Sequence, residues 1–336
     1  MAESLGAEPA DPVLEPISGA DLRRLLDEPL PSKGCPPEAV LRLCRDILIR
    51  YNRRNGHPDF FAYVCASADP IGVLADALAS AMNQNVTAWR SAPPAAELER
   101  RVIAWLDEMV GFAGPGHGLL VGGGSAANFN ALAAAILNVA DSTVSRERMT
   151  VYLSRDAHVS LSKAARLLGI QSQHIRKISL DARRRLDPAG LARQLEADRT
   201  AGLVPACICA SAGTANTGAI DPLAEIADLV SGHRIWFHID GAYGAPAAMT
   251  DDYAWMKIGF ARADSLSLDP HKWLFAPLDA GCILYRDPAA SARAFSVQAE
   301  YTAVSQTDPI EGFAFFDHGL ELSRRFRALK VWMILK

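Results

Sequence analysis

Short apolar runs alternate with helix-length segments over the half of the chain from Gly118 to Asp287. The runs of strand length are 118–124, 150–154, 178–180, 204–213, 234–240, 263–269 and 281–287. The helix-length segments between them are 125–140, 160–168, 186–200 and 221–233. A strand–helix–strand unit returns the chain to the same end of the sheet, so its two strands pair in parallel. The alternation therefore predicts an α/β domain whose mostly parallel sheet carries helices on both faces.

The first 90 residues lack this alternation. Residues 1–20 are rich in proline and acidic side chains and predict a loose arm. Apolar periodicity predicts helices at 37–54, 71–86 and 93–112. These helices carry little charge on their inner faces, so we expect them to pack on the main body or on a second subunit. We therefore divide the chain into a helical N-terminal arm or dimerisation segment, 1–90, and a large domain, 91–336.

The composition limits the class of protein. With 336 residues, 50% of them hydrophobic, the chain can bury a full core, and a net charge of −4 argues against a nucleic-acid or anionic-membrane surface. No stretch approaches the ~20 apolar residues of a membrane span. The acidic N-terminus has no apolar signal-peptide core, so a cytoplasmic location is expected.

The six cysteines show no paired CxxC spacing. Cys207 and Cys209 lie two apart on one predicted strand and should point to one face of the sheet. Buried reduced thiols are therefore expected, in preference to a disulfide, and no metal site is predicted. At the other end of the chain, residues 324–336 predict an apolar helix that stops without a capping glycine or a polar tail. We expect the sequence to be a fragment that a further domain follows.

Glycines and polar residues gather where the predicted strands end. The run Gly122–Ser125 leads from a strand into a helix, where backbone N–H groups and the helix dipole favour an anion; a simple helix cap is the alternative. His158 follows the strand 150–154 and could stack on a planar ring or bond to the helix backbone. Thr214, in the small polar run 211–218, could bind the edge of a ligand or form a turn.

Two further strand ends carry charged groups. Asp240 follows a strongly apolar strand, where a carboxylate is costly unless it is paired; a helix-capping aspartate is the alternative. His238 shares its face of the strand and is expected in the core. The last strand end reads DPHKW, in which Pro270 stops the strand and Lys272 follows at the edge where open α/β sheets bind ligands. Taken alone, Lys272 could also be a surface lysine.

Pyridoxal phosphate (PLP) is the ligand that uses all of these groups. Its phosphate needs an anion cradle, its ring nitrogen a carboxylate, its ring face a stacking group and its aldehyde a lysine amine. No metal or nucleotide site would use all four.

The motifs resemble those of the PLP-dependent group II amino-acid decarboxylases, which include the aromatic-amino-acid, glutamate, histidine and diaminobutyrate enzymes. The resemblance runs from about Pro37 to the end and is carried by HPDFFAY, Trp89 to Glu99, GGGSAAN, DAHVS, AGTANTGAID, HIDGAYG, DPHKW and SRRFRALKVW. It implies an aspartate-aminotransferase-like (type I) large domain, a small C-terminal domain absent from this sequence, and a homodimer with a shared active site. It also implies decarboxylation of an L-amino acid to an amine and CO2.

The resemblance also implies residue roles. Lys272 would form the Schiff base with the cofactor, and Asp240 would pair with the pyridine nitrogen. His158 and Ala242 would lie on the two faces of the ring. The remaining cofactor contacts are Gly124, Ser125 and His271 at the phosphate, and Thr214 on the third strand end. The catalytic residues are then Lys272, Asp240 and His158.

The sequence departs from the aromatic-substrate relatives at several positions. Ala215 stands where a threonine commonly follows the Gly-Thr pair, and the corresponding substrate-pocket positions are Asn55, Val64 and 85–87. The stretch 312–318 contains no tyrosine to protonate the product carbanion, and the nearest one is Tyr301.

Four hypotheses stay open at this point. They are decarboxylation, oxidative deamination to an aldehyde with peroxide, transamination or retro-aldol cleavage, and a non-catalytic protein that kept the fold.

Overall fold

The computed structural model describes residues 11–140, 144–297, 308 and 310–336, and these divide into two compact units. The first unit runs to Ala68 and the second from Asp69 to Lys336. The sequence predicted the division at 90/91. The structure assigns the helix that begins at Pro70 to the larger unit.

The smaller unit is helical. Helix α2 (Gly19–Leu26) begins after Ser18, whose hydroxyl accepts the Asp21 N–H at 3.0 Å. Helix α3 (Pro37–Leu43) runs directly into a π-helical segment, Cys44–Ile49. The helix predicted at 37–54 is therefore confirmed, and its second half is wound more widely than an α-helix.

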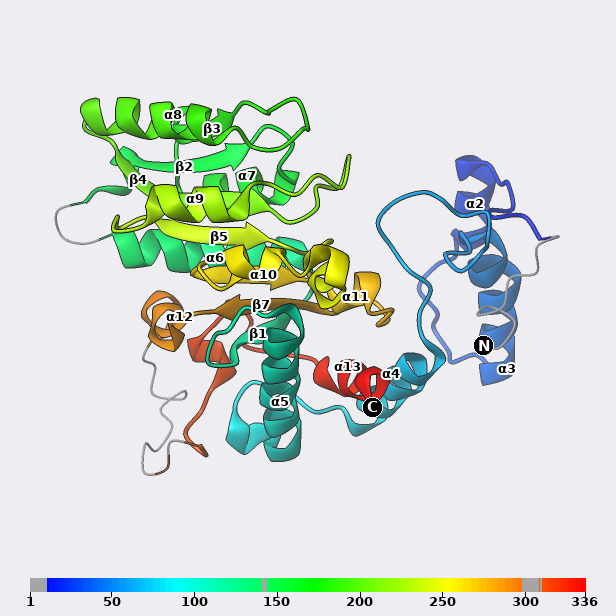
Figure 1. Cartoon of the computed structure of the whole chain (residues 1–336). Coiled ribbons are helices and arrows are strands. Elements are labelled where there is room, and N and C mark those ends of the chain that lie inside the picture. The colour runs from blue at the N-terminus through cyan, green and yellow to red at the C-terminus, as the bar shows by residue number, and fades with distance from the viewer. Residues whose placement is uncertain (1–10, 141–143, 298–307, 309) are drawn as a thin grey trace. The chain divides into compact units, whose positions relative to one another are not determined.

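The larger unit is built on a seven-stranded sheet with the order β1-β7-β6-β5-β4-β2-β3 (Figure 1). Its strands are β1 His117–Val121, β2 Met149–Ser154, β3 Ile175–Ile178, β4 Val204–Ser211, β5 Trp236–Asp240, β6 Ser265–Leu268 and β7 Gly281–Tyr285. Strands β3, β2, β4, β5 and β6 pair in parallel, whereas β7 is antiparallel to both β6 and β1. The predicted mostly parallel sheet is confirmed, but β3 lies earlier than the predicted 178–180.

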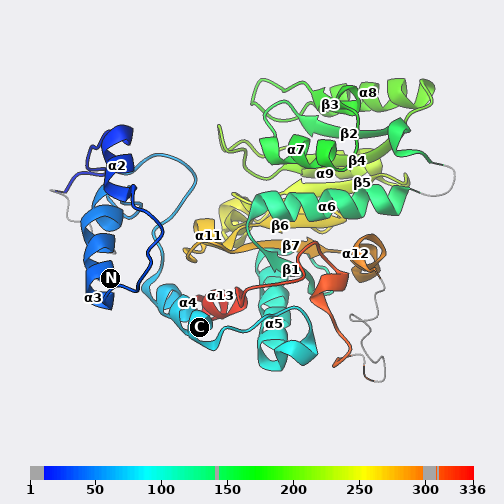
Figure 2. The same cartoon turned by 180° about the vertical axis from the view of Figure 1, so that it is seen from behind.

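Helices cover both faces of this sheet, as predicted. Helices α8, α9 and α10 lie over the face seen in Figure 1, and α6 and α7 lie over the opposite face seen in Figure 2. The helices of this unit are α4 Pro70–Met82, α5 Pro93–Val110, α6 Gly124–Val139, α7 Val159–Leu167, α8 Pro188–Thr200, α9 Leu223–Val230, α10 Met256–Phe260, α11 Pro270–Trp273, α12 Pro288–Phe295 and α13 Ala328–Leu335. Helix α5 packs beside β1, and α13 packs against α4 and α5.

The helix ends follow from local chemistry. Proline opens α5, and Gly111 closes it at φ 69°, a left-handed conformation that glycine adopts without strain. Asp69 caps α4 by accepting the Ile71 N–H, and left-handed Asn83 ends that helix four residues before the predicted limit.

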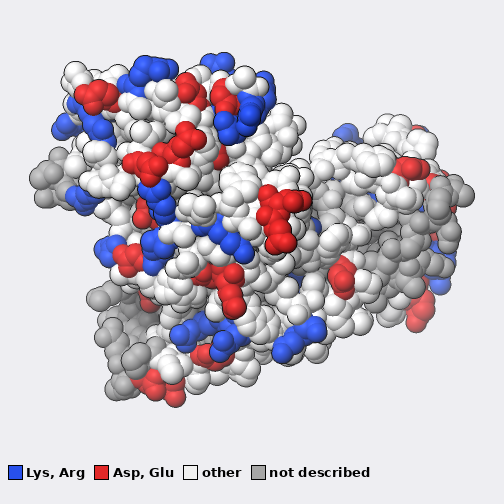
Figure 3. All heavy atoms as spheres, in the orientation of Figure 1, with Lys and Arg blue, Asp and Glu red and all other residues white. Residues whose placement is uncertain are grey.

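The core lies between the sheet and its helices. Strands β2, β5, β6 and β7 are buried along their whole length. On β4 the buried thiols of Cys207 and Cys209 are hydrogen-bonded at 3.6 Å between Sγ atoms and form no disulfide, which confirms the prediction that both share one face. Burial raises the pKa of the Cys207 thiol. Among the described residues no helix is long and apolar enough to cross a membrane. On the face shown in Figure 3, basic and acidic side chains are interspersed.

Candidate active site

A cavity of about 280 Å³ lies at the carboxyl ends of β4, β5 and β6, beside the turn that follows β1. All of the predicted site residues line it: Gly124, Ser125, His158, Thr214, Asp240, Ala242, His271 and Lys272. The parallel strands explain this convergence, because their carboxyl ends meet at one edge of the sheet.

The glycine turn forms one wall of the cavity. Gly123 adopts φ 126°, a conformation open mainly to glycine, and α6 begins at the next residue. A Cβ on Gly124 would lie 2.8 Å from the Cβ of Ala242, and one on Gly281 would lie 2.4 Å from the Gly123 Cα. Bare backbone is therefore required here, and it presents the N-terminal N–H groups of a 16-residue helix, a natural cradle for an anion.

Lys272 projects from the short helix α11 toward this wall. Its Nζ lies 3.0 Å from Oδ2 of Asp269, whose side chain is only 2% exposed. Burial raises the pKa of Asp269, and the nearby Lys272 and His271 oppose that shift. Oδ1 of Asp269 is buried without a hydrogen-bond partner among the described residues. Asp269 was not among the residues predicted for the site. The signal was available, because it is an acid directly before the proline that ends a strand.

The His271 ring is held by the backbone. Its Nδ1 accepts the Ala280 N–H at 3.1 Å, and burial lowers the pKa of the ring. With Nδ1 used as an acceptor, the neutral ring carries its proton on Nε2, which lies 3.5 Å from Asp269 Oδ2. His271 thus supplies an N–H donor beside the glycine turn, as the phosphate contact predicted for it requires.

Asp240 ends β5 and is 7% exposed. Its Oδ1 accepts the Ala242 N–H and the Ser267 hydroxyl, both at 3.2 Å, and its Oδ2 accepts the amide of Asn128 at 2.9 Å. Three donors satisfy this carboxylate, so its burial is compensated.

His158 and Thr214 take the backbone-capping and turn positions considered for them, and both also line the cavity. His158 caps α7, because its Nδ1 accepts the Ser160 N–H at 3.3 Å, and it also lines the cavity. Thr214 lies in a turn in which its Oγ1 is 2.9 Å from that of Thr217, and it lines the cavity too.

Other residues have roles that the sequence did not reveal. Asn128 and Tyr243 line the cavity, and the Tyr243 ring packs edge-on against Trp273 with 5.3 Å between ring centroids. Ala215, which stands where relatives commonly carry a threonine, lines the cavity, whereas none of the predicted substrate-pocket positions does. In the 85–87 segment Asn85 and Val86 instead contact Arg324, and Asn55 and Val64 belong to the other unit. Tyr301 lies outside the described residues.

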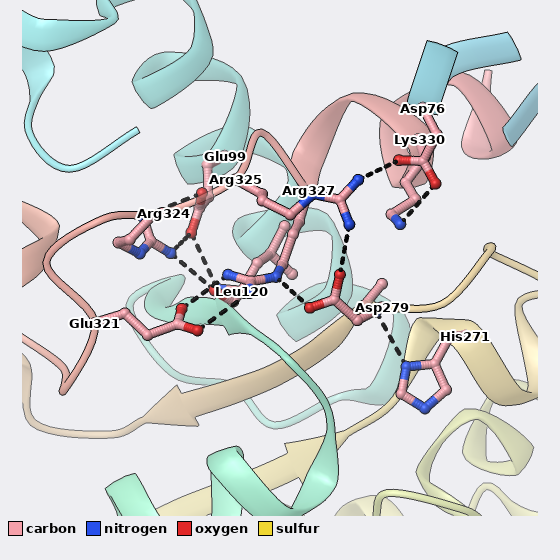
Figure 4. Close-up of polar contacts among 11 residues, drawn as sticks. Asp76, Glu99, Leu120, His271, Asp279, Glu321, Arg324, Arg325, Arg327 and Lys330 are labelled. Carbon is pink, nitrogen blue, oxygen red and sulfur yellow. Dashed lines mark hydrogen bonds and ion pairs between the residues drawn. The ribbon is translucent and has the colours of Figure 1, made fainter. Parts of the chain in front are cut away.

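A network of ion pairs supports the glycine turn from the side of α13 (Figure 4). Arg324 binds Glu99 and the Leu120 carbonyl of β1, while Arg327 donates to Asp279 Oδ2 at 3.0 Å and to Glu321. Asp279 directly precedes Ala280, whose N–H holds His271. The network therefore fixes both β1 and the segment that orients the histidine.

The residues present fit PLP. A cradle that any Cβ would fill suits a phosphate, a buried carboxylate suits a ring nitrogen that carries a proton, and a lysine amine lies in the same cavity. Oδ2 of Asp269 lies 3.0 Å from the Lys272 Nζ and forms an ion pair with it.

Comparisons with known proteins agree with this chemistry. The profile of the pyridoxal-dependent decarboxylase conserved domain matches residues 20–336. The chain is 40% identical to an aromatic-L-amino-acid decarboxylase of Bacillus atrophaeus, over 97% of this chain and 67% of that protein. It is 31% identical to a phenylacetaldehyde synthase of Petunia hybrida, over 97% and 66%.

A solved structure has the same fold. The crystal structure of Oryza sativa TDC with PLP and tryptamine superposes with a TM-score of 0.90 at 30% identity, over 96% of this chain and 69% of that one. The chain spans about two thirds of the length of these relatives. The predicted family, fold, PLP cofactor and carboxy-lyase class are confirmed. The chain belongs to the pyridoxal-dependent decarboxylase family.

Proposed function

We propose that the protein decarboxylates an aromatic L-amino acid to the amine and CO2, with PLP held by Lys272. The observation that carries the proposal is the single cavity that contains the Lys272 amine, the buried Asp240 carboxylate and the N-terminus of α6. Bound PLP supplies an electron sink for the electrons left behind when the substrate loses CO2. The whole protein's substrate is inferred from its relatives.

Different residues of the cavity would contact the aldehyde, the ring nitrogen and the phosphate of PLP. Lys272 would hold PLP through its amine, at the aldehyde of the cofactor. Asp240 holds a proton on the ring nitrogen, because a carboxylate beside that atom stabilises its positive charge. The phosphate is taken by Gly124, Ser125 and the Nε2–H of His271.

Three uncharged or stacking contacts complete the binding of the ring. With PLP in the cavity, His158 and Ala242 would lie on the two faces of its ring and Thr214 at its edge. Tyr243 lines the cavity, and its ring packs edge-on against Trp273 behind it, which gives the cavity an aromatic rim on this side. Together with the aromatic substrates named for the relatives, this rim supports an aromatic side chain on the substrate.

The test compares Lys272→Ala with a matched control, Lys163→Ala, whose lysine lies on α7 and does not line the cavity. PLP-loaded protein is incubated with L-tryptophan, L-tyrosine, L-DOPA and L-glutamate, and CO2 and amine are measured. We expect turnover of an aromatic substrate by the wild type and by Lys163→Ala. Lys272→Ala should lose turnover and the absorbance of the lysine-bound cofactor. An unchanged spectrum in Lys272→Ala would remove that residue from its role.

Oxidative deamination is the second candidate. The stretch 312–318 has no tyrosine, its Phe315 is buried against Arg324, and one relative is a phenylacetaldehyde synthase. A peroxide assay run beside the CO2 assay separates the two reactions. Amine without peroxide supports decarboxylation, and aldehyde with stoichiometric peroxide supports the alternative.

We further propose a cytoplasmic homodimer with a shared site. Helix α4 exposes Ile71, Leu74, Leu78 and Met82 along one face, which suits a subunit contact. The six unpaired cysteines suit a reducing compartment. Light scattering of the purified protein tests the dimer, and a monomer at micromolar concentration would refute it. Cofactor absorbance without turnover on any amino acid would favour a non-catalytic protein.

A further inference from the structure

The Asp240 carboxylate is the end of a buried chain of hydrogen bonds that begins at Trp236. The indole Nε1–H of Trp236 donates to Ser265 Oγ at 2.8 Å, and Ser265 Oγ lies 2.9 Å from His238 Nδ1. His238 Nε2 lies 3.0 Å from Asn128 Oδ1, and Asn128 Nδ2 donates to Asp240 Oδ2 at 2.9 Å. The strand register explains the assembly, because His238 pairs with Ser265, and Asp240 with Ser267, on neighbouring β5 and β6.

The donor and the acceptor of each hydrogen bond between Trp236 and Asp240 follow from the chemistry of the side chains. Asn128 donates its amide hydrogen to Asp240 Oδ2, so its amide oxygen faces His238. That oxygen requires a donor, which places a proton on His238 Nε2. Burial lowers the pKa of His238 to about 4, so the ring is neutral and its Nδ1 accepts. Ser265 therefore donates to His238 and accepts from the indole, which can only donate.

The second amide hydrogen of Asn128 reaches the other side of the cavity. Asn128 Nδ2 also donates to Ser160 Oγ at 3.0 Å, and that oxygen lies 2.8 Å from His158 Nδ1. His158 Nδ1 already accepts the Ser160 N–H, so the hydroxyl proton of Ser160 points to it as well. Through Ser160, the Asn128 side chain thus connects Asp240, the proposed partner of the ring nitrogen, to His158, the residue proposed for the ring face.

We infer that Asn128 and His238 are positioning residues that fix the Asp240 carboxylate and the His158 ring for the cofactor. Asn128 sits one turn into α6, the helix whose N-terminus would hold the phosphate, so the same helix sets the distance between the phosphate and the ring-nitrogen partner. The positioning role toward PLP rests on the proposed function, whereas the hydrogen-bond directions can be tested in the apoprotein.

The first experiment reads those directions without any cofactor. Nitrogen-15 NMR of histidine-labelled apoprotein, with His238 assigned by its loss in His238→Gln, should show a neutral Nε2–H ring that does not titrate between pH 6 and 8. A proton on Nδ1, or a doubly protonated ring at pH 7, would overturn the inference.

The second experiment measures PLP affinity of the apoprotein by equilibrium dialysis. Asn128→Asp keeps the shape and the acceptor for His238 but replaces the donor to Asp240 by a second carboxylate oxygen. Asn130→Asp is the matched control, because Asn130 is equally buried on the same helix and bonds only to backbone groups. We expect Asn128→Asp to bind PLP about 10-fold or more weakly, as for a lost charge-assisted hydrogen bond, and Asn130→Asp to bind within about 3-fold of the wild type. Equal affinities for the two variants would refute the positioning role.

A pair of histidine variants decides the matter if Asn128→Asp fails to fold. Glutamine at 238 can place an N–H where the ring Nε2–H lies, whereas the shorter asparagine reaches only toward Ser265. His238→Gln should therefore retain PLP affinity and the absorbance of the lysine-bound cofactor, and His238→Asn should lose both. The reverse order would overturn the inference. A wild type that binds no PLP would instead contradict the proposed function, while the NMR result would still stand.

Discussion

Removal of the Arg324 side chain gives the sharpest test of how the active-site cavity is supported. Arg324 and its partner Glu99 are both almost fully buried, with exposed side-chain fractions of 2% and 0%. The guanidinium also donates to the carbonyls of Val86 and Leu120, each at 2.8 Å, and lies 4.3 Å above the Phe315 ring. One side chain thereby joins the segment after α4, helix α5, strand β1 and the C-terminal segment.

The magnitude follows from what Arg324→Met leaves behind. The Glu99 carboxylate would stay buried with only the Leu120 N–H, at 3.0 Å, as a named donor, and two carbonyls would lose theirs. Breaking a buried ion pair in this way typically costs about 3–5 kcal/mol. That is a large fraction of the total stability of about 5–15 kcal/mol that most domains have.

Urea denaturation followed by fluorescence measures the change in free energy of unfolding. The neighbouring Arg325→Met is the control, because Arg325 is 56% exposed and its ion pairs lie at the surface, where such pairs contribute at most about 1 kcal/mol. Adding Glu99→Gln to Arg324→Met should recover part of the loss, since it removes the uncompensated charge. The reasoning fails if Arg324→Met and Arg325→Met cost the same, or if the double variant is the less stable one.

Two further predictions concern the glycine turn and the dependence of stability on pH. Gly281→Ala would place a Cβ 2.4 Å from the Gly123 Cα. We therefore expect the free energy of unfolding, measured by urea denaturation, to fall by about 1–3 kcal/mol and PLP to bind more weakly. Gly34→Ala, with nothing within 4 Å, should change neither, and a neutral Gly281→Ala would contradict the close approach. Burial lowers the pKa of His117 and of His318 from 6.5 to about 4, so the unfolded chain binds more protons between these values. The free energy of unfolding should therefore fall as the pH drops from 6.5 to 4, by up to about 3 kcal/mol for each ring, and should fall less in His318→Asn; equal slopes would refute the assignment.

The helices and strands of the sheet domain, and most residues that line the cavity, could be predicted from the sequence. Strand and helix periodicity are local properties, so the alternation from Gly118 onward located the parallel sheet. The strand ends then converge by topology alone, and the predicted residues from Gly124 to Lys272 line one cavity. Their individual roles toward the cofactor stay predictions.

The parts that the sequence could not predict depend on tertiary contacts. Strand β7 is apolar throughout, and such a run looks the same in either direction, so its antiparallel pairing was not foreseen. Asn128 looks like any helix residue until β5 brings Asp240 and His238 beside it. Arg324 lies 225 positions from Glu99, and no local pattern reports such a pair.

The place of β1 in the sheet also bears on the order in which the protein can fold during synthesis. Among the described strands β1 lies at the edge of the sheet and pairs with β7 alone, with His117 opposite Tyr285, 168 residues later. At about 5–20 residues per second, a ribosome needs roughly 8–34 s to add that length of chain. During this interval β1 has no strand to pair with, although β2 to β6 can already assemble. We therefore expect the glycine turn that follows β1 to be among the last parts of the cavity to take shape.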